Sequence, residues 1–98
     1  MELIQTNDML ADQSKHAERF LKLDHTQFIN VQMRKDEVLN EHHSKETVII
    51  IVRKGRVEFN FEGKKTIVTT ENVLKMEPNE IHDVLALEDT DFIIIKAD

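Results

Sequence analysis

The sequence predicts an all-β fold of antiparallel strands, arranged as a sandwich or a barrel. One observation is the run at 48–52, where five β-branched residues follow one another shortly before Gly55. β-Branched side chains crowd a helix, and an unbroken apolar run of this length is typical of a strand that is buried on both faces. The other observation is that, from Phe20 onward, apolar residues recur at every second position and turn residues separate the runs.

The alternation predicts individual strands. In residues 28–34, Ile29, Val31 and Met33 fall on one face and polar residues on the other, which is typical of a half-buried strand. Residues 57–61 alternate in the same way after Gly55. Further strands are predicted at 65–69, 73–76, 81–87 and 91–95.

The dipeptide Glu62-Gly63 predicts a two-residue β-hairpin loop. A type I′ turn would need positive φ angles at both positions, and a glutamate tolerates this conformation poorly. We therefore expect a positive φ at Gly63 only, or a looser loop.

The length of 98 residues predicts one domain with a single modest core. We place the barrel domain at residues 20–98. Residues 1–19 have no strong period, and we expect them to form either a short helix or an ordered arm.

Composition excludes several classes of function. The net charge of −6 argues against a nucleic-acid partner and against an anionic membrane surface. The chain has no cysteine, so neither disulfides nor thiolate metal sites can form. The first residues lack the pattern of a signal peptide, and no segment approaches the ~20 apolar residues that span a bilayer. We expect a cytoplasmic protein.

One further set of residues spans most of the chain: Leu39 to His42, the apolar strand, Gly55, Asn72, Pro78, His82 and the tail at 85–89. Together these residues resemble the motifs of a small single-domain cupin, and the resemblance covers roughly residues 31–96. The resemblance implies an antiparallel double-stranded β-helix, or jelly-roll barrel, with a central cavity and most often a dimeric assembly. In cupins, three histidines and a glutamate usually hold a divalent metal in this cavity.

The metal-binding motif of this chain is degenerate when it is aligned on Gly55. The glutamate position falls on Val48, the second histidine on Ser44 and the first on His42. The third histidine is His82, one residue closer to the motif's proline than in the family pattern. A serine is a poor ligand at neutral pH and a valine is none, so two of the four ligand positions are lost.

Strand parity gives an independent assignment of the inner face. Side chains at even spacing share a face, so His42 lies on the side of Val48 along an unbroken strand. His43 then points outward. A β-bulge between residues 43 and 47 would reverse this arrangement and bring His43 and Glu41 inside.

One predicted function is the binding of a small molecule in the barrel cavity without catalysis, with His42 and His82 orienting the ligand. The plainer alternative is that both histidines are polar residues of a vestigial cavity, bonded to backbone or water. The residues that we expect to line the cavity are His42, Ser44, Val48, Ile50, Val57, Phe59, His82, Val84 and Ala86.

A second predicted function is a metal-dependent enzyme of the isomerase or dioxygenase type that uses His42 and His82. We expect either no metal or a weakly bound divalent ion such as zinc, nickel, manganese or iron. His43 and Glu46 are further candidate donors.

We also expect a homodimer. The segment at 18–34 carries many large apolar side chains for a chain this small, and a second subunit would bury them and protect strand edges. The residues concerned are Phe20, Leu21, Leu23, Phe28 and Ile29.

Overall fold

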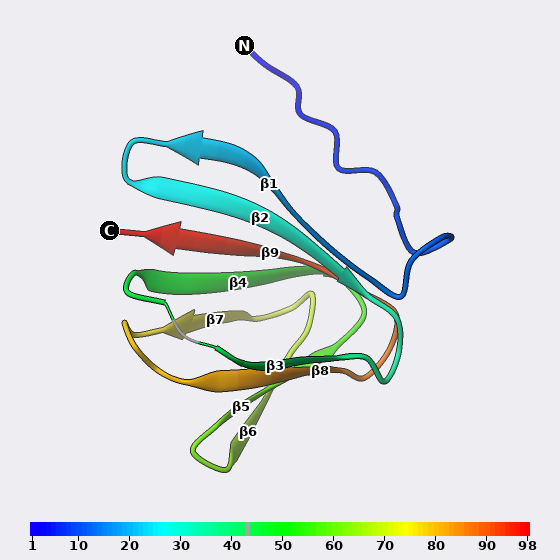
Figure 1. The fold of residues 1–98 in the computed structure, drawn as a ribbon, viewed down its shortest axis with the longest axis vertical. Helices are drawn as coiled ribbons and strands as arrows, with labels where there is room; N and C mark the ends of the chain where they lie inside the picture. The colour runs from blue at the N-terminus through cyan, green and yellow to red at the C-terminus, as the bar shows by residue number, and fades with distance from the viewer. Residues whose placement is uncertain (43) are drawn as a thin grey trace.

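The computed structural model describes residues 1–42 and 44–98, with only the backbone described at Glu41 and His42. This part of the chain forms nine strands and no helix (Figure 1). Among the described residues there is accordingly no helix of the length and apolar character that crossing a membrane requires. The strands are β1 Lys15–Leu23, β2 Thr26–Met33, β3 Val38–His42, β4 Thr47–Lys54, β5 Val57–Phe61, β6 Lys64–Val68, β7 Val73–Met76, β8 His82–Ala86 and β9 Thr90–Ala97.

The strands form two antiparallel sheets that lie one over the other (Figure 1). The five-stranded sheet has the order β1-β2-β9-β4-β7, and the four-stranded sheet has the order β3-β8-β5-β6. The inward residues of both sheets form one apolar core, which contains Val52 and Phe92 from the first sheet and Val57 and Ala86 from the second. The predicted all-β, antiparallel fold is confirmed.

Strand β4 is buried on one face only, so the expectation of burial on both faces was wrong. Val48, Ile50 and Val52 are 5%, 1% and 4% exposed, whereas Ile51 between them is 39% exposed. The inner face packs against the second sheet, but no other described segment covers Ile51 on the outer face. The unbroken apolar run therefore marks an apolar outer surface.

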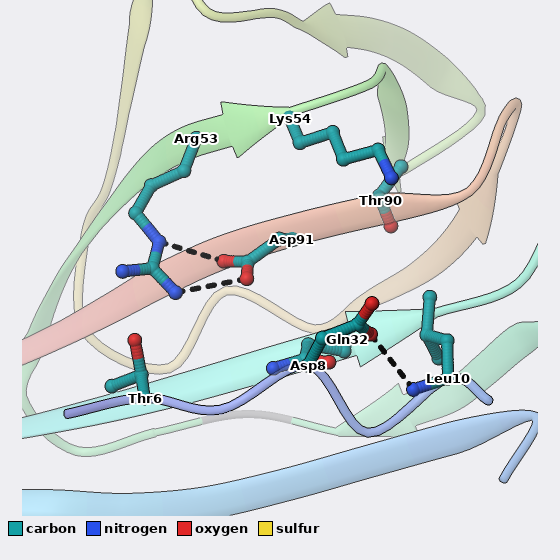
Figure 2. Close-up of a pocket in the computed structure, with 8 residues that line it drawn as sticks. All are labelled: Thr6, Asp8, Leu10, Gln32, Arg53, Lys54, Thr90 and Asp91. Carbon is teal, nitrogen blue, oxygen red and sulfur yellow. Dashed lines mark hydrogen bonds and ion pairs between the residues drawn. The ribbon is translucent and has the colours of Figure 1, made fainter. Parts of the chain in front are cut away.

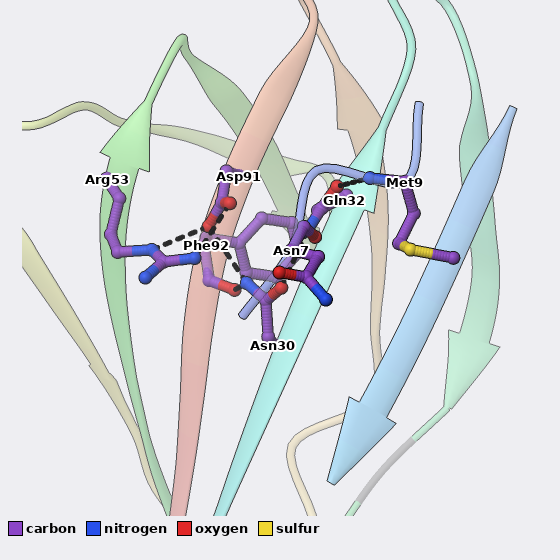
Figure 3. Close-up of polar contacts among 7 residues, drawn as sticks. All are labelled: Asn7, Met9, Asn30, Gln32, Arg53, Asp91 and Phe92. Atoms are coloured by element: carbon purple, nitrogen blue, oxygen red, sulfur yellow. Dashed lines mark hydrogen bonds and ion pairs between the residues drawn. The ribbon is translucent and has the colours of Figure 1, made fainter. Parts of the chain in front are cut away.

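Strand β2 departs from its prediction in the opposite sense. Val31 and Met33 lie in the core as expected, but Asn30 and Gln32 on the other face are also buried, at 3% and 2% exposure. Residues 7–9 of the N-terminal arm pass over this face and bond to Gln32, while Asn30 is bonded to Gln32 and Asp91 (Figure 3). The strand is therefore not half-exposed.

The predicted hairpin is present, with Phe61 paired to Lys64 across the two-residue loop. Glu62 has a φ of 51° and Gly63 a φ of 78°, so both central residues adopt the conformation of a type I′ turn. The expectation of a positive φ at Gly63 only was wrong. A type I′ turn matches the right-handed twist of the flanking strands, and this match offsets the cost of the strained glutamate.

The N-terminal segment forms no helix, contrary to one of the two alternatives. Strand β1 begins at Lys15, ahead of residue 20, and pairs with β2 as far as Met33. Before it, residues 1–14 form an arm whose turn is closed by bonds from the amides of Asp12 and Gln13 to the carbonyl oxygen of Met9, at 3.4 and 3.2 Å. We refer to residues 1–14 as the arm.

Candidate functional site

A pocket of about 150 Å³ opens between the two sheets, and we refer to it as the inter-sheet pocket. Its walls come from β5, β6 and β8 on one side and from β7 on the other. The wall is largely aromatic and aliphatic, with polar groups toward the rim. Its lining residues are Phe59, Phe61, Lys64, Thr66, Leu74, Lys75, Met76, Glu80 and His82.

His82 is the buried polar group of this pocket. The alternating burial of β8 turns His82, Val84 and Ala86 inward, and His82 is 6% exposed. Its Nδ1 lies 3.3 Å from the carbonyl oxygen of Glu80, and its ring centroid lies 5.6 Å from that of Phe59. An imidazole in this position can donate a hydrogen bond to a ligand or accept one from it.

The other predicted lining residues are found deeper in the fold. Val57 and Ala86 are fully buried, and the ring of Phe59 packs at 6.0 Å against that of Phe92. The space that the resemblance assigns to a cavity is filled at this level by close-packed hydrocarbon. Of the predicted set, Phe59 and His82 line the inter-sheet pocket, whereas Val48, Ile50, Val57, Val84 and Ala86 belong to the core.

Ser44 and Glu46 interact with each other in the loop before β4. The Ser44 hydroxyl donates a hydrogen bond to the Glu46 carboxylate and accepts one from the Glu46 amide at 3.2 Å. The bond from Ser44 lowers the pKa of the Glu46 carboxyl. Glu46 lines a recess of about 40 Å³ with His25 and Lys96, and this recess does not contain His82.

A larger pocket, of about 390 Å³, lies between the arm and the five-stranded sheet (Figure 2). We refer to it as the arm pocket. Sequence reasoning missed it, because its walls come from residues far apart in the chain and only the adjacent cations Arg53 and Lys54 hinted at a charged site. Its lining residues are Thr6, Asp8, Leu10, Gln32, Arg53, Lys54, Thr90 and Asp91.

Arg53 and Asp91 form an ion pair at the edge of the arm pocket. Arg53 Nε and Nη2 donate to the two carboxylate oxygens of Asp91, each at 2.8 Å, and Asn30 Nδ2 donates to the same carboxylate at 2.8 Å (Figure 3). The hydrogen bonds to Asp91 raise the pKa of the Arg53 guanidinium. The pair is therefore fixed in orientation by a buried amide.

Comparison with known proteins identifies the family. The family model of the AraC-like ligand binding domain matches residues 31–92, which is more than half of the chain. The chain belongs to this family. It is a small cupin domain, as the resemblance predicted.

Solved cupin structures have the same fold. A cupin superfamily protein from Desulfitobacterium hafniense is 16% identical, with a TM-score of 0.79 over 88% of this chain and 78% of that chain. An RmlC-like cupin from Desulfovibrio desulfuricans is 19% identical, with a TM-score of 0.79 over 95% of each chain. KdgF from Halomonas is 17% identical, with a TM-score of 0.78 over 98% of this chain and 86% of that chain. No curated protein matches the sequence.

Among the cupin motif positions whose side chains the structure describes, His82 is the one ordinary metal ligand. The backbone register places the Cα atoms of His42 and His82 opposite each other on β3 and β8. The His42 side chain and the whole of His43 lie outside the described residues. Within the described part, no three His, Asp or Glu side chains come together in a way that could hold an ion. The remaining motif positions are a serine bonded to Glu46 and a core valine.

Proposed function

We propose that this cupin domain binds a small organic molecule in the inter-sheet pocket and acts in the cytoplasm without catalysis of its own. The observation that carries this proposal is a buried histidine, His82, in the wall of a pocket that it shares with apolar and charged side chains. Ligand pockets commonly combine such walls with a few polar groups that orient the ligand. The absence of cysteine from the sequence is compatible with a reducing compartment.

The lining suggests what kind of molecule would fit. Phe59, Phe61 and Leu74 offer apolar contact. The charged lining residues are two lysines, Lys64 and Lys75, and one carboxylate, Glu80, so positive charge is in excess. A volume of about 150 Å³ is that of a cavity that accepts benzene. The proposed ligand is therefore a small molecule with an apolar or aromatic body and a polar or anionic end.

An enzyme of the isomerase or dioxygenase type is the alternative. Its support is the register that sets His42 opposite His82, because two imidazoles on neighbouring strands can begin a metal site. The two proposals differ in their need for a metal ion, so binding of an organic ligand to metal-free protein favours the first.

The proposal is tested by titrating the metal-free, ¹⁵N-labelled protein with benzoate and following the amide resonances. We expect shifts at Phe59, Thr66 and His82. The substitution Leu74→Trp fills the pocket and should abolish these shifts. Ile67→Trp is the matched control, because Ile67 neighbours Thr66 in β6 but is 47% exposed.

Two results would contradict the proposal. One is benzoate binding that Leu74→Trp leaves unchanged. The other is the absence of saturable shifts around His82 with benzoate and with the uncharged probe benzamide.

A further inference from the structure

The arm pocket has opposite charges on its two sides. Strand β4 supplies the cations Arg53 and Lys54, and the arm supplies the carboxylate of Asp8 (Figure 2). Consecutive residues of a regular strand point to opposite faces. The register of β4 with β9 shifts between Val52 and Lys54, and this irregularity allows both cations to line one pocket.

Asp8 is held in place through its two neighbours in the chain. Gln32 Nε2 donates to the carbonyl oxygen of Asn7 at 2.7 Å, and Gln32 Oε1 accepts from the amide of Met9 at 2.8 Å (Figure 3). Gln32 is 2% exposed and also donates to Asn30 at 2.8 Å, so its amide has little freedom to move. The backbone on both sides of Asp8 is thus bound to the sheet.

The charges of the pocket are not all compensated within the protein. The ion pair with Asp91 engages Arg53, and one oxygen of Asp8 accepts from the amide of Leu10 at 3.0 Å. Within the described part of the chain, the Lys54 side chain forms no hydrogen bond or ion pair. The second oxygen of Asp8 accepts no hydrogen bond from those residues either. One cation and one carboxylate oxygen therefore remain for a ligand on opposite sides of the pocket.

We propose that the arm pocket binds a free zwitterionic amino acid. Lys54 pairs with the ligand carboxylate, and Asp8 pairs with its ammonium group. A ligand with only one charged group would pair with either Lys54 or Asp8 and leave the other side chain without a partner in the pocket. The volume of about 390 Å³ lies in the range of small-molecule sites, and Leu10 offers contact to an apolar side chain such as that of leucine.

The test is a titration of the ¹⁵N-labelled full chain with three matched probes. L-Leucine carries both charged groups, 4-methylpentanoate only the carboxylate, and 3-methylbutylamine only the ammonium. We expect leucine to shift the amides of Asp8, Lys54 and Asp91. Each analogue should bind with an affinity at least about tenfold lower, because it lacks one charged hydrogen bond.

Two substitutions locate the binding. Lys54→Met and Asp8→Asn should each weaken leucine binding about tenfold, whereas Lys64→Met at the rim of the inter-sheet pocket should not change it. The inference is overturned if leucine does not bind, if an analogue binds as well as leucine, or if neither Lys54→Met nor Asp8→Asn weakens binding. Leucine shifts that centre on His82 would also overturn it. The benzoate titration is independent of all these outcomes, since it reports on the other pocket.

Discussion

At the scale of single residues, two positions of the cupin metal motif have structural roles in this chain. Val48 is part of the core, and Ser44 is bonded to Glu46. A valine in place of a carboxylate removes the negative charge that would neutralise a divalent ion. The remaining candidates, His42 and His82, supply no carboxylate to replace it.

We therefore expect metal well below one ion per chain in protein purified without an affinity tag, and weak binding of added zinc or nickel. His42→Ala and His82→Ala should each abolish this binding, because one imidazole is too few ligands. His43→Ala should leave most of it. Titration calorimetry with zinc measures these affinities. Stoichiometric metal in the purified protein, or a larger loss from His43→Ala than from His42→Ala, would contradict the prediction.

The Ser44–Glu46 bond makes a prediction about pH. Because the bond lowers the pKa of Glu46 below its ordinary 4.5, it favours the folded state above that value. This contribution is lost as the pH falls through the folded-state pKa. Ser44→Ala should raise the Glu46 pKa toward 4.5 and weaken the dependence of stability on pH in this acidic window. An NMR titration of the Glu46 side-chain carboxyl carbon measures the shift. An unchanged pKa in Ser44→Ala would show that the bond is not formed in solution.

At the scale of elements, the two glycines end strands in different surroundings. Both have a positive φ, of 81° at Gly55 and 78° at Gly63. A Cβ atom at Gly55 would lie 2.4 Å from the backbone oxygen of Asp89, whereas at Gly63 it would meet nothing within 4 Å. Gly63 is therefore required by its backbone conformation, and Gly55 also by a close approach to the chain before β9.

Substitutions at Gly63 and Gly55 should consequently lower the free energy of unfolding by different amounts. Gly63→Val should lower the free energy of unfolding by about 1–2 kcal/mol, because a β-branched residue is forced into a left-handed conformation. Gly55→Ala should cost about 3 kcal/mol or more, since the backbone clash is added to a similar conformational cost. Urea unfolding measures both, with Gly63→Ala as the control for conformation without the clash. Equal losses for Gly55→Ala and Gly63→Ala would contradict the role of the close approach.

At the scale of the whole molecule, the outer face of the five-stranded sheet carries an apolar surface beside the arm. The register aligns Phe28, Ile95 and Ile49 in one row across β2, β9 and β4. The next apolar row runs across β9, β4 and β7 and ends at Val73, which is 61% exposed. The residues of this surface are Phe28, Ile49, Ile51, Val73, Ile93 and Ile95.

Part of the segment on which the dimer prediction rested lies beside this surface. Phe20 and Phe28 pack against each other with ring centroids 6.3 Å apart, and Leu23 is 54% exposed. Ile29 instead packs against the core. We propose that a second copy of the chain covers the apolar surface, because large contiguous apolar surfaces usually mark interaction sites.

We expect light scattering at micromolar concentration to give twice the monomer mass of 11.5 kDa. Ile51→Lys places a charge in the middle of the apolar surface and should shift the protein toward monomer. Ile67→Lys is the control, because Ile67 is also exposed, at 47%, but belongs to the other sheet. A monomer mass for the wild-type protein would contradict the proposed dimer.

The amino-acid sequence by itself determined seven of the nine strands with their approximate bounds, the hairpin loop and the inward direction of His82. It did not predict β1, and the expected unbroken strand from His42 to Val48 was wrong, because β3 ends at His42 and β4 begins at Thr47 in the other sheet. These features depend on side-chain period and turn chemistry, which act between near neighbours in the chain. Val57, Phe59 and Val84 were assigned to the inner face for this reason, and they do lie there. The degenerate motif could also be identified from the sequence, because the motif is defined by residue type and spacing.

Only the tertiary structure decided what covers each face. Asn30 and Gln32 are polar in an alternating strand, yet both are buried, Gln32 under the arm and Asn30 beside Asp91 of β9. Ile51 lies in an unbroken apolar run, yet it is exposed because no layer covers it. Burial depends on which distant segment of the chain packs on a surface, and a local sequence pattern does not predict that segment. The arm pocket arises in the same way, since it needs the arm, which carries Asp8, to pack over the sheet that carries Lys54.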